Sequence, residues 1–87
     1  MEELEYLYDE GVNFKIVHGE DGYTVNIESV NPLMGTFATF DEMLFGIAPI
    51  VQQYAFDILD VEAFAIALDV NFKNELGDNG ITEILMK

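Results

Sequence analysis

The sequence predicts an α+β fold, in which an antiparallel sheet of two β-hairpins packs against a kinked central helix. Two alternating runs joined by a short glycine-bearing loop indicate the first hairpin, and apolar residues at helical spacing indicate the helix. A second alternation towards the C-terminus indicates the other hairpin. At 87 residues the chain has room for one core, so we expect a single acidic domain over residues 1–87.

Residues 1–10 are predicted to form a short N-terminal helix or an edge strand. Leu4, Leu7 and Tyr8 are spaced i, i+3, i+4, which favours a helix with one apolar face. Acids in its first turn suit the helix dipole, and Gly11 is able to end it. We prefer the helix; the alternative is an edge strand over residues 4–8.

A period of two defines the first hairpin. Residues 14–18 and residues 23–28 place apolar or aromatic side chains at every second position. The loop between them, Gly19-Glu20-Asp21-Gly22, is short and begins and ends with glycine, as hairpin loops often do. Asn31-Pro32 closes the second strand, because proline cannot continue a ladder.

The central helix is predicted to begin at a capping box, Thr39-Phe40-Asp41-Glu42. The Thr39 hydroxyl is expected to accept from the Glu42 amide, and the Glu42 carboxylate to reach back to Thr39. Apolar residues then follow helical spacing as far as Tyr54. Pro49 lies inside this pattern with Gly46 close by, so we expect a kinked or broken helix.

Residues 60–76 satisfy a strand pattern and a helix pattern at once. Large apolar side chains alternate from Phe64 to Phe72, as in a strand, while a helical face with Asp60 as its cap and Gly77 as its stop is the alternative. Three alanines favour the helix by intrinsic propensity. We expect the strand, because the turn-like residues 77–80 and the run 81–85 supply a partner for it.

Negative charge is the outstanding feature of the composition. Seventeen Asp and Glu face three Lys and no Arg, which gives a net charge of −14. A field of this sign repels nucleic acid and anionic lipid and attracts basic surfaces. We therefore expect no direct nucleic-acid binding, no membrane binding and no nucleotide cofactor, since Arg and Lys are the usual phosphate ligands.

The remaining composition predicts a folded, cytoplasmic protein. Hydrophobic residues make up 51% of the chain, with seven Phe and four Tyr, whereas a disordered acidic tail has few aromatics. The absence of Cys excludes disulfides and thiolate metal sites and suits a reducing compartment. The acidic N-terminus is unlike a signal peptide, and the longest apolar stretch, near Phe64–Leu68, is too short to span a bilayer.

Candidate catalytic residues are few, and we expect no enzyme activity. His18 is the only His, and one His supplies neither a base with its partner nor a zinc ligand set, so we expect a half-buried strand residue. Ser29 is the only Ser, and no base is close to it in sequence.

Two acidic segments resemble cation sites only in part, and we expect neither a metal nor a cofactor. Asp57, Asp60 and Glu62 have the donors for a divalent cation, but a helix cap with solvated acids is the preferred reading. Asp78-Asn79-Gly80 lacks the alternating ligands of a calcium loop and is typical of a tight turn.

The spacing of the acids suggests a second use for them. Side chains at i and i+2 of a strand lie roughly 6.5–7 Å apart, and those at i and i+4 of a helix about 6 Å apart, which is comparable to successive phosphates of nucleic acid. The alternative is a charged surface kept for solubility. We expect the partner-binding acids to fall in three clusters, Glu2/Glu5/Asp9, Glu20/Asp21 and Asp57/Asp60/Glu62, with Tyr6, Tyr8 and Tyr23 as exposed aromatic anchors.

In size, charge and architecture the chain resembles the small acidic inhibitors carried by phages and mobile elements. These include anti-restriction and anti-CRISPR proteins, many of which mimic DNA. The resemblance rests on no diagnostic motif and carries over no individual residue. It implies tight, non-enzymatic binding to a nuclease or another DNA-handling enzyme.

About half of the chain is also similar to the N-terminal domain of the HicB antitoxins. Residues 14–27 include the Gly22-Tyr23 step of that family's hairpin, and residues 35–44 match its glycine followed by a threonine-led acidic helix. The family's usual Cys or small loop residue and its C-terminal DNA-binding segment are missing here. The resemblance therefore implies at most the fold and a toxin-neutralising interface.

We accordingly predict an acidic inhibitor that mimics DNA phosphates and blocks the basic groove of a nucleic-acid enzyme such as a CRISPR or restriction nuclease. The alternative is a HicB-like antitoxin or protein-interaction module that uses an apolar face. Both give the chain a protein partner, a basic one in the first case. The oligomeric state stays open, a dimer included.

Overall fold

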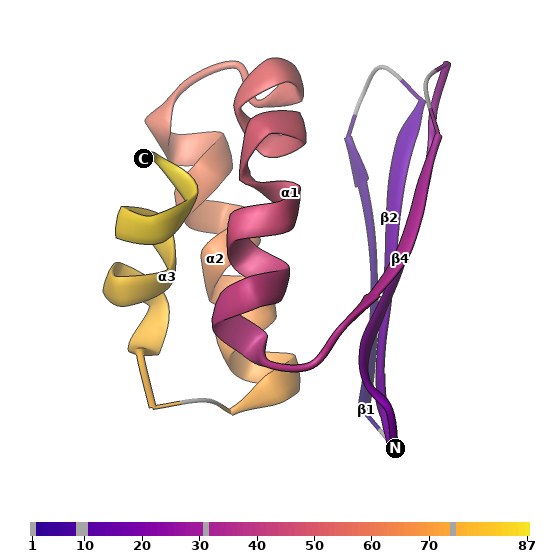
Figure 1. Cartoon of the computed structure of the whole chain (residues 1–87). Helices are drawn as coiled ribbons and strands as arrows, with labels where there is room; N and C mark the ends of the chain where they lie inside the picture. Colours follow the sequence, from indigo (N-terminus) through magenta and orange to yellow (C-terminus); the bar gives the residue numbers. More distant parts are fainter. Residues whose placement is uncertain (1, 9–10, 31, 74) are drawn as a thin grey trace.

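Four strands are followed along the chain by three helices (Figure 1). The computed structural model describes residues 2–8, 11–30, 32–73 and 75–87. The strands are β1 (Glu2–Tyr8), β2 (Val12–Gly19), β3 (Gly22–Glu28) and β4 (Leu33–Phe37). The helices are α1 (Phe40–Tyr54), α2 (Ile58–Phe72) and α3 (Gly77–Leu85).

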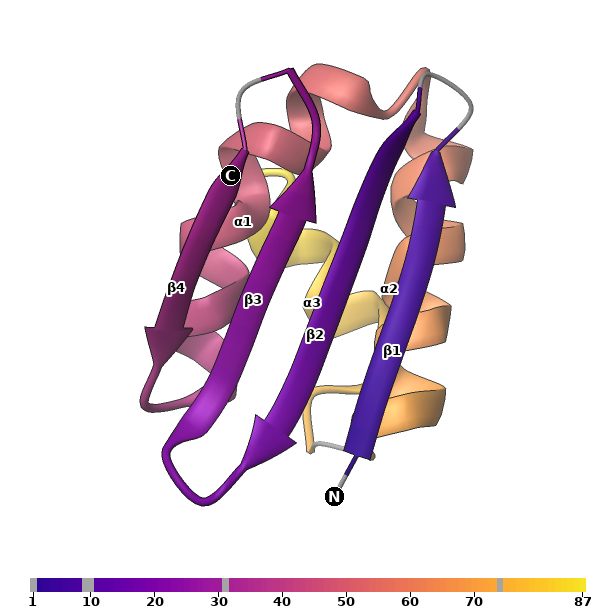
Figure 2. The same cartoon turned by 90° about the vertical axis from the view of Figure 1, so that its right-hand side faces the viewer.

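The strands form one antiparallel sheet in the order β1-β2-β3-β4 (Figure 2). Tyr6 pairs with Phe14 and Phe14 with Ile27, so these three side chains share one face of the sheet. That face is covered by helices and the other is open to solvent, as the alternation of buried and exposed residues along β2 and β3 requires.

The helices form two further layers on the covered face (Figure 1). α1 and α2 lie against the sheet, and α3 packs on the outer side of both. The Gln52 side chain donates to the Leu85 carbonyl at 2.6 Å, which ties the end of α3 to α1. Residues fully buried between these layers come from every helix and from the two central strands: Phe14, Ile16, Val25, Ile27, Met43, Leu44, Ile47, Val51, Phe64, Ala65, Leu68, Ile81 and Leu85.

The α+β class, the first hairpin and the central helix are confirmed. β2 and β3 join through the predicted loop, and Gly22 has a φ of 116°, a conformation that side chains rarely adopt. A Cβ at this position would lie 2.2 Å from the carbonyl oxygen of Phe37. The Glu42 amide donates to the Thr39 hydroxyl at 3.1 Å, so α1 begins at the predicted cap.

The prediction of a second hairpin is wrong, because residues 58–72 and 77–85 are helices. α2 is apolar on two opposite sides, and such a helix satisfies a period of two as well as a period of 3.6. Its cap is Asp57 rather than Asp60. Residues 77–80 are the first turn of α3, where the predicted hairpin turn was placed.

The N-terminal segment is the edge strand of the sheet, so the preferred short helix is wrong and its alternative is right. Pairing with β2 turns Leu4, Tyr6 and Tyr8 towards the core. Leu7, which the helical spacing grouped with Leu4 and Tyr8, lies on the open face and is exposed.

Pro49 does not break the central helix, which runs as one element from Phe40 to Tyr54. Proline removes one intrahelical hydrogen bond, to the carbonyl of Phe45. Both residues lie on the exposed side of α1, where water can bind the carbonyl. A broken helix, one of the two predicted outcomes, is therefore wrong.

Candidate functional site

Acidic side chains lie on all sides of the molecule, and none in the described residues is buried. Cationic partners are scarce. In the described part of the chain, ion pairs form only between Lys15 and two carboxylates, Glu5 and Glu28, and between His18 and Glu2. The other described carboxylates form no ion pair. Their negative charges therefore produce a strong electrostatic field that attracts a basic partner.

The first predicted acidic cluster is divided between the two faces of the sheet. Glu5 lies on the open face, whereas Glu2 lies on the helix-covered side, where its carboxylate is 2.8 Å from His18 Nδ1. In a strand, side chains an odd number of residues apart point to opposite faces. Glu2 and Glu5 are three residues apart, so they do not share a face as they would in a helix. Asp9, its third member, lies outside the described residues.

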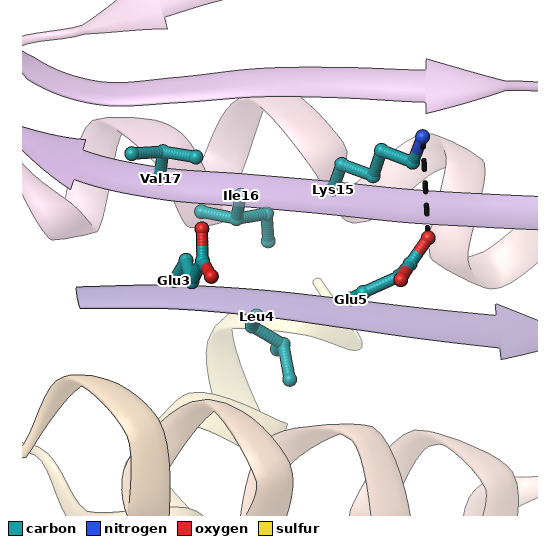
Figure 3. Close-up of a pocket in the computed structure, with 6 residues that line it drawn as sticks. All are labelled: Glu3, Leu4, Glu5, Lys15, Ile16 and Val17. Carbon is teal, nitrogen blue, oxygen red and sulfur yellow. Dashed lines mark ion pairs between the residues drawn. The ribbon is translucent and has the colours of Figure 1, made fainter.

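Lys15 draws two acids together on the open face. Its ammonium is 4.0 Å from Glu5 and 3.2 Å from Glu28, and Asn13 donates to the same carboxylates at 2.7 and 3.4 Å. Figure 3 shows Lys15 on β2 and Glu5 on β1 pointing towards one another. Both residues, together with Glu3, line a depression of about 370 Å³. Exposed pairs of this kind contribute at most about 1 kcal/mol. Glu5 is therefore partly neutralised.

The Asp57/Asp60/Glu62 cluster is mainly a helix cap. Asp57 accepts from the Asp60 amide at 3.2 Å, and the Asp60 carboxylate accepts from the Phe56 amide at 2.7 Å. These bonds satisfy two backbone donors at the start of α2. The preferred reading of this segment, a cap with solvated acids, is confirmed.

Replacing Asp57 with Ala should lower the free energy of unfolding by about 1 kcal/mol, because the Asp60 amide loses its side-chain acceptor and keeps only the Asp57 carbonyl, 3.1 Å away. Urea denaturation followed by circular dichroism measures this loss. Asp57→Asn is the control, because it keeps a side-chain oxygen at the cap and should lose much less. Equal losses in both variants would contradict the capping role.

Acids from three elements meet at one end of the molecule. The loop between β2 and β3 carries Glu20 and Asp21, and it lies beside the segment that leads into α1, since Gly22 approaches Phe37 and Ala38. Asp41 and Glu42 are in the first turn of α1, and β1 begins at the same end (Figures 1 and 2). We call this group, Glu2, Glu20, Asp21, Asp41 and Glu42, the acidic end.

The sequence predicted three members of the acidic end but not their meeting with Asp41 and Glu42. In the sequence these two residues stand out only as parts of a capping box. Their place in the first turn of a helix is the signal that indicates exposed acids, because acids there complement the helix dipole. Asp57 and Asp60 start α2 near the opposite end of the sheet, so the predicted clusters do not form one face.

The expectation that the tyrosines are exposed anchors is wrong for Tyr8 and Tyr23, each of which is 8% exposed. Tyr6 is half-buried, with its ring centroid 4.9 Å from that of Phe64. The exposed aromatics among the described residues are instead Phe45 on α1, 55% exposed, and Phe56 just before α2, 89% exposed. A strand that turns every second side chain inward accounts for all three tyrosines.

His18 is the predicted half-buried strand residue. Its ring stacks on Tyr23 with centroids 4.1 Å apart and an angle of 4° between the planes. No group of three or more His, Asp or Glu that could hold a metal ion occurs in the described residues. Within the same residues, no helix has the length and apolar character to cross a membrane.

The buried tyrosines make the fold sensitive to alkaline pH. Burial, together with negative charge at Tyr6 and Asp60, raises the pKa of Tyr8 well above its ordinary value of 10.0. The Tyr8 hydroxyl is buried and has no hydrogen-bond partner in the structure. Burial also raises the pKa of Tyr6, with a contribution from Asp60, and that of Tyr23, with one from Glu2.

Because the pKa of Tyr8 is higher in the folded than in the unfolded chain, its contribution to stability is fully present below pH 10. That contribution is lost progressively as pH rises above 10. Above that pH the unfolded chain releases tyrosine protons that the folded chain still holds. We therefore expect the free energy of unfolding to fall as pH rises past 10, and to fall less in Tyr8→Phe. Urea titrations on both sides of pH 10 measure the difference; parallel curves for the two proteins would contradict it.

Comparison with known proteins does not assign the chain to a family. No family model, curated protein or solved structure matches it.

Proposed function

We propose that this protein is a non-enzymatic acidic inhibitor that occupies the cationic groove of a nucleic-acid enzyme, such as a CRISPR or restriction nuclease, in place of nucleic-acid phosphates. The acidic end is the observation that supports this proposal. Glu20, Asp21 and Glu42 are exposed carboxylates that the β2–β3 loop and the first turn of α1 place at the same end of one core. No ion pair neutralises these three within the described residues.

The electrostatics of such a site favour fast capture of a basic partner. Charges of one sign raise association rates by about 10- to 1000-fold when the partner carries the opposite sign. Exposed charges act over about 8 Å at physiological salt, so carboxylates grouped at one end add their fields there. The same field repels nucleic acid itself, which leaves a basic protein as the partner.

The fold holds these carboxylates in place against their mutual repulsion. Gly22 allows the β2–β3 loop to touch the backbone of Phe37 and Ala38, and the Thr39 cap fixes the first turn of α1. Acids on fixed backbone lose little further conformational entropy when they bind, which favours affinity. A flexible acidic tail would have to be ordered first.

Affinity capture with a salt gradient tests the proposal. The immobilised protein should retain a nucleic-acid enzyme from host lysate and release it as salt rises. The triple variant Glu20→Gln/Asp21→Asn/Glu42→Gln should retain much less of that enzyme. Glu5→Gln/Glu28→Gln/Glu83→Gln is the control, because it also changes the net charge from −14 to −11 but leaves the acidic end intact. Equal retention by both variants, or retention unaffected by salt, would overturn the proposal.

A second candidate function is a protein-interaction module, antitoxin-like in kind, that binds its partner through an apolar face. The apolar side chains exposed along α2 favour it. In this case the acids serve solubility, and retention of the partner should survive both triple variants. Loss of retention on changing α2 would separate this function from the first.

A further inference from the structure

α2 carries a second apolar face besides the one that it buries. Its buried residues are Val61, Phe64, Ala65, Leu68 and Phe72. At 100° per residue, Leu59, Ala63, Ile66 and Val70 fall on the opposite side of the helix. These residues, which we call the α2 stripe, are exposed, Leu59 to 69%, Ile66 to 49% and Val70 to 64%.

The spacing within the α2 stripe is that of a helix–helix contact. Its members follow one another at intervals of four, three and four residues, as in the apolar seam of a coiled coil. Phe56 is also exposed, just before the N-terminal end of the helix. A helix with apolar residues all round is normally covered on every side. Apolar residues that lie together on a surface, rather than scattered singly, mark interaction sites.

Carboxylates border the α2 stripe on both sides. Glu62 and Asp69 lie one turn from Leu59 and Ile66 along one border, and Asp60 lies one turn from Ala63 along the other. None of the three forms an ion pair within the described residues. An apolar seam with acids on both borders is complementary to an apolar seam bordered by bases.

A second copy of this chain is poorly suited to cover the α2 stripe. Two stripes packed together would bring the acids of one copy beside those of the other, with a charge of −14 on each. Like charges held close across an interface are destabilising. Residues 58–72 of α2 include no base, and Lys73 follows them as the C-cap.

We propose that the α2 stripe docks a basic amphipathic helix of the partner protein, with Leu, Ile or Val in its seam and Lys or Arg at the borders. The proposal rests on the proposed function in taking the partner to be basic. The stripe spans residues 59–70, which is about 17 Å at 1.5 Å per residue, so three turns of the docked helix contact it. Its seam fills the spaces between the stripe residues, and its bases pair with Asp60, Glu62 and Asp69.

A model peptide tests this docking without knowledge of the partner. The probe is an amphipathic helix of about 18 residues with Leu in the seam and Lys elsewhere, at concentrations where the peptide alone is monomeric. The control peptide has the same composition in an order that gives no apolar face. By isothermal titration calorimetry at physiological salt, the amphipathic peptide should bind the full chain about tenfold tighter than the control or better.

Matched variants assign that binding to the α2 stripe. Ile66→Gln/Val70→Gln keeps the charge, and Gln favours a helix at least as well as Ile or Val, so the fold should persist with an unchanged circular dichroism spectrum. This variant should bind the amphipathic peptide about tenfold more weakly. Leu7→Gln/Met34→Gln, which removes two equally exposed apolar side chains from the open face of the sheet, should bind like the wild type.

Three results would overturn the docking proposal: equal binding of the two peptides, unchanged binding by Ile66→Gln/Val70→Gln, or a wild-type dimer that this variant converts to a monomer in light scattering. The last would assign the α2 stripe to a second copy. The docking and the proposed function fail separately. The peptide result does not depend on the acidic end, and salt-dependent capture through the acidic end does not depend on the stripe.

Discussion

Neutralising the acidic end should slow association with the basic partner about tenfold or more at low salt. In Glu20→Gln/Asp21→Asn/Glu42→Gln, the field loses three exposed carboxylates where the partner approaches, whereas the amide side chains keep the shape of the surface. Stopped-flow or surface plasmon resonance measurements from about 50 to about 500 mM salt give the rate, and the difference between variant and wild type should shrink as screening increases. The dissociation rate should change less.

The charge-matched variant Glu5→Gln/Glu28→Gln/Glu83→Gln is the control for this measurement. It loses the same net charge from the open face and from α3, and two of its acids are already compensated by Lys15. A smaller effect on the association rate is therefore expected. If both variants slow association equally, net charge alone steers the encounter and the acidic end has no special part.

Replacing Phe64 with Ala should lower the free energy of unfolding of the domain by about 3–5 kcal/mol. Phe64 is fully buried, and its ring lies within 4.9 to 6.0 Å of the rings of Tyr6, Phe14 and Tyr8. It joins α2 to β1 and β2, so its removal leaves a cavity between the layers. A domain of this size has a total free energy of unfolding of about 5–15 kcal/mol, so the loss is a large fraction of it.

Phe56→Ala is the matched control, because it removes the same side chain from a position that is 89% exposed. We expect a change within about 0.5 kcal/mol for it. Urea denaturation of the two variants gives both values. Similar losses at positions 56 and 64 would contradict the packing described for α2, and with it the assignment of its exposed and buried faces.

Local signals sufficed for the elements that depend on local chemistry. The glycine-flanked loop before Tyr23 and the Thr39 cap specify the first hairpin and α1 without reference to the remainder of the chain. The second half of the chain lacked such a signal. Phe64, Ile66 and Leu68 fit a strand, but only Phe64 and Leu68 are buried, whereas Ile66 is 49% exposed. An exposed apolar position misleads any pattern that equates apolar with buried.

The acids of the candidate site could be found from the sequence, but their grouping could not. Glu2 and Glu5 separate because β1 is a strand, and Asp57 and Asp60 bind backbone amides at the start of α2. Glu20 and Asp21 lie at the same end of the molecule as Asp41 and Glu42, where Gly22 approaches the Phe37–Ala38 backbone. No spacing in the sequence encodes that contact.

Displacement of nucleic acid from the captured enzyme is the most direct test of the central claim, that the acidic end takes the place of phosphates. Fluorescence anisotropy of a labelled duplex bound to that enzyme should fall to the value of free duplex as this protein is added. The acidic-end variant should require at least about tenfold more protein for the same effect. A duplex that stays bound while the inhibitor joins it in a ternary complex would contradict the claim.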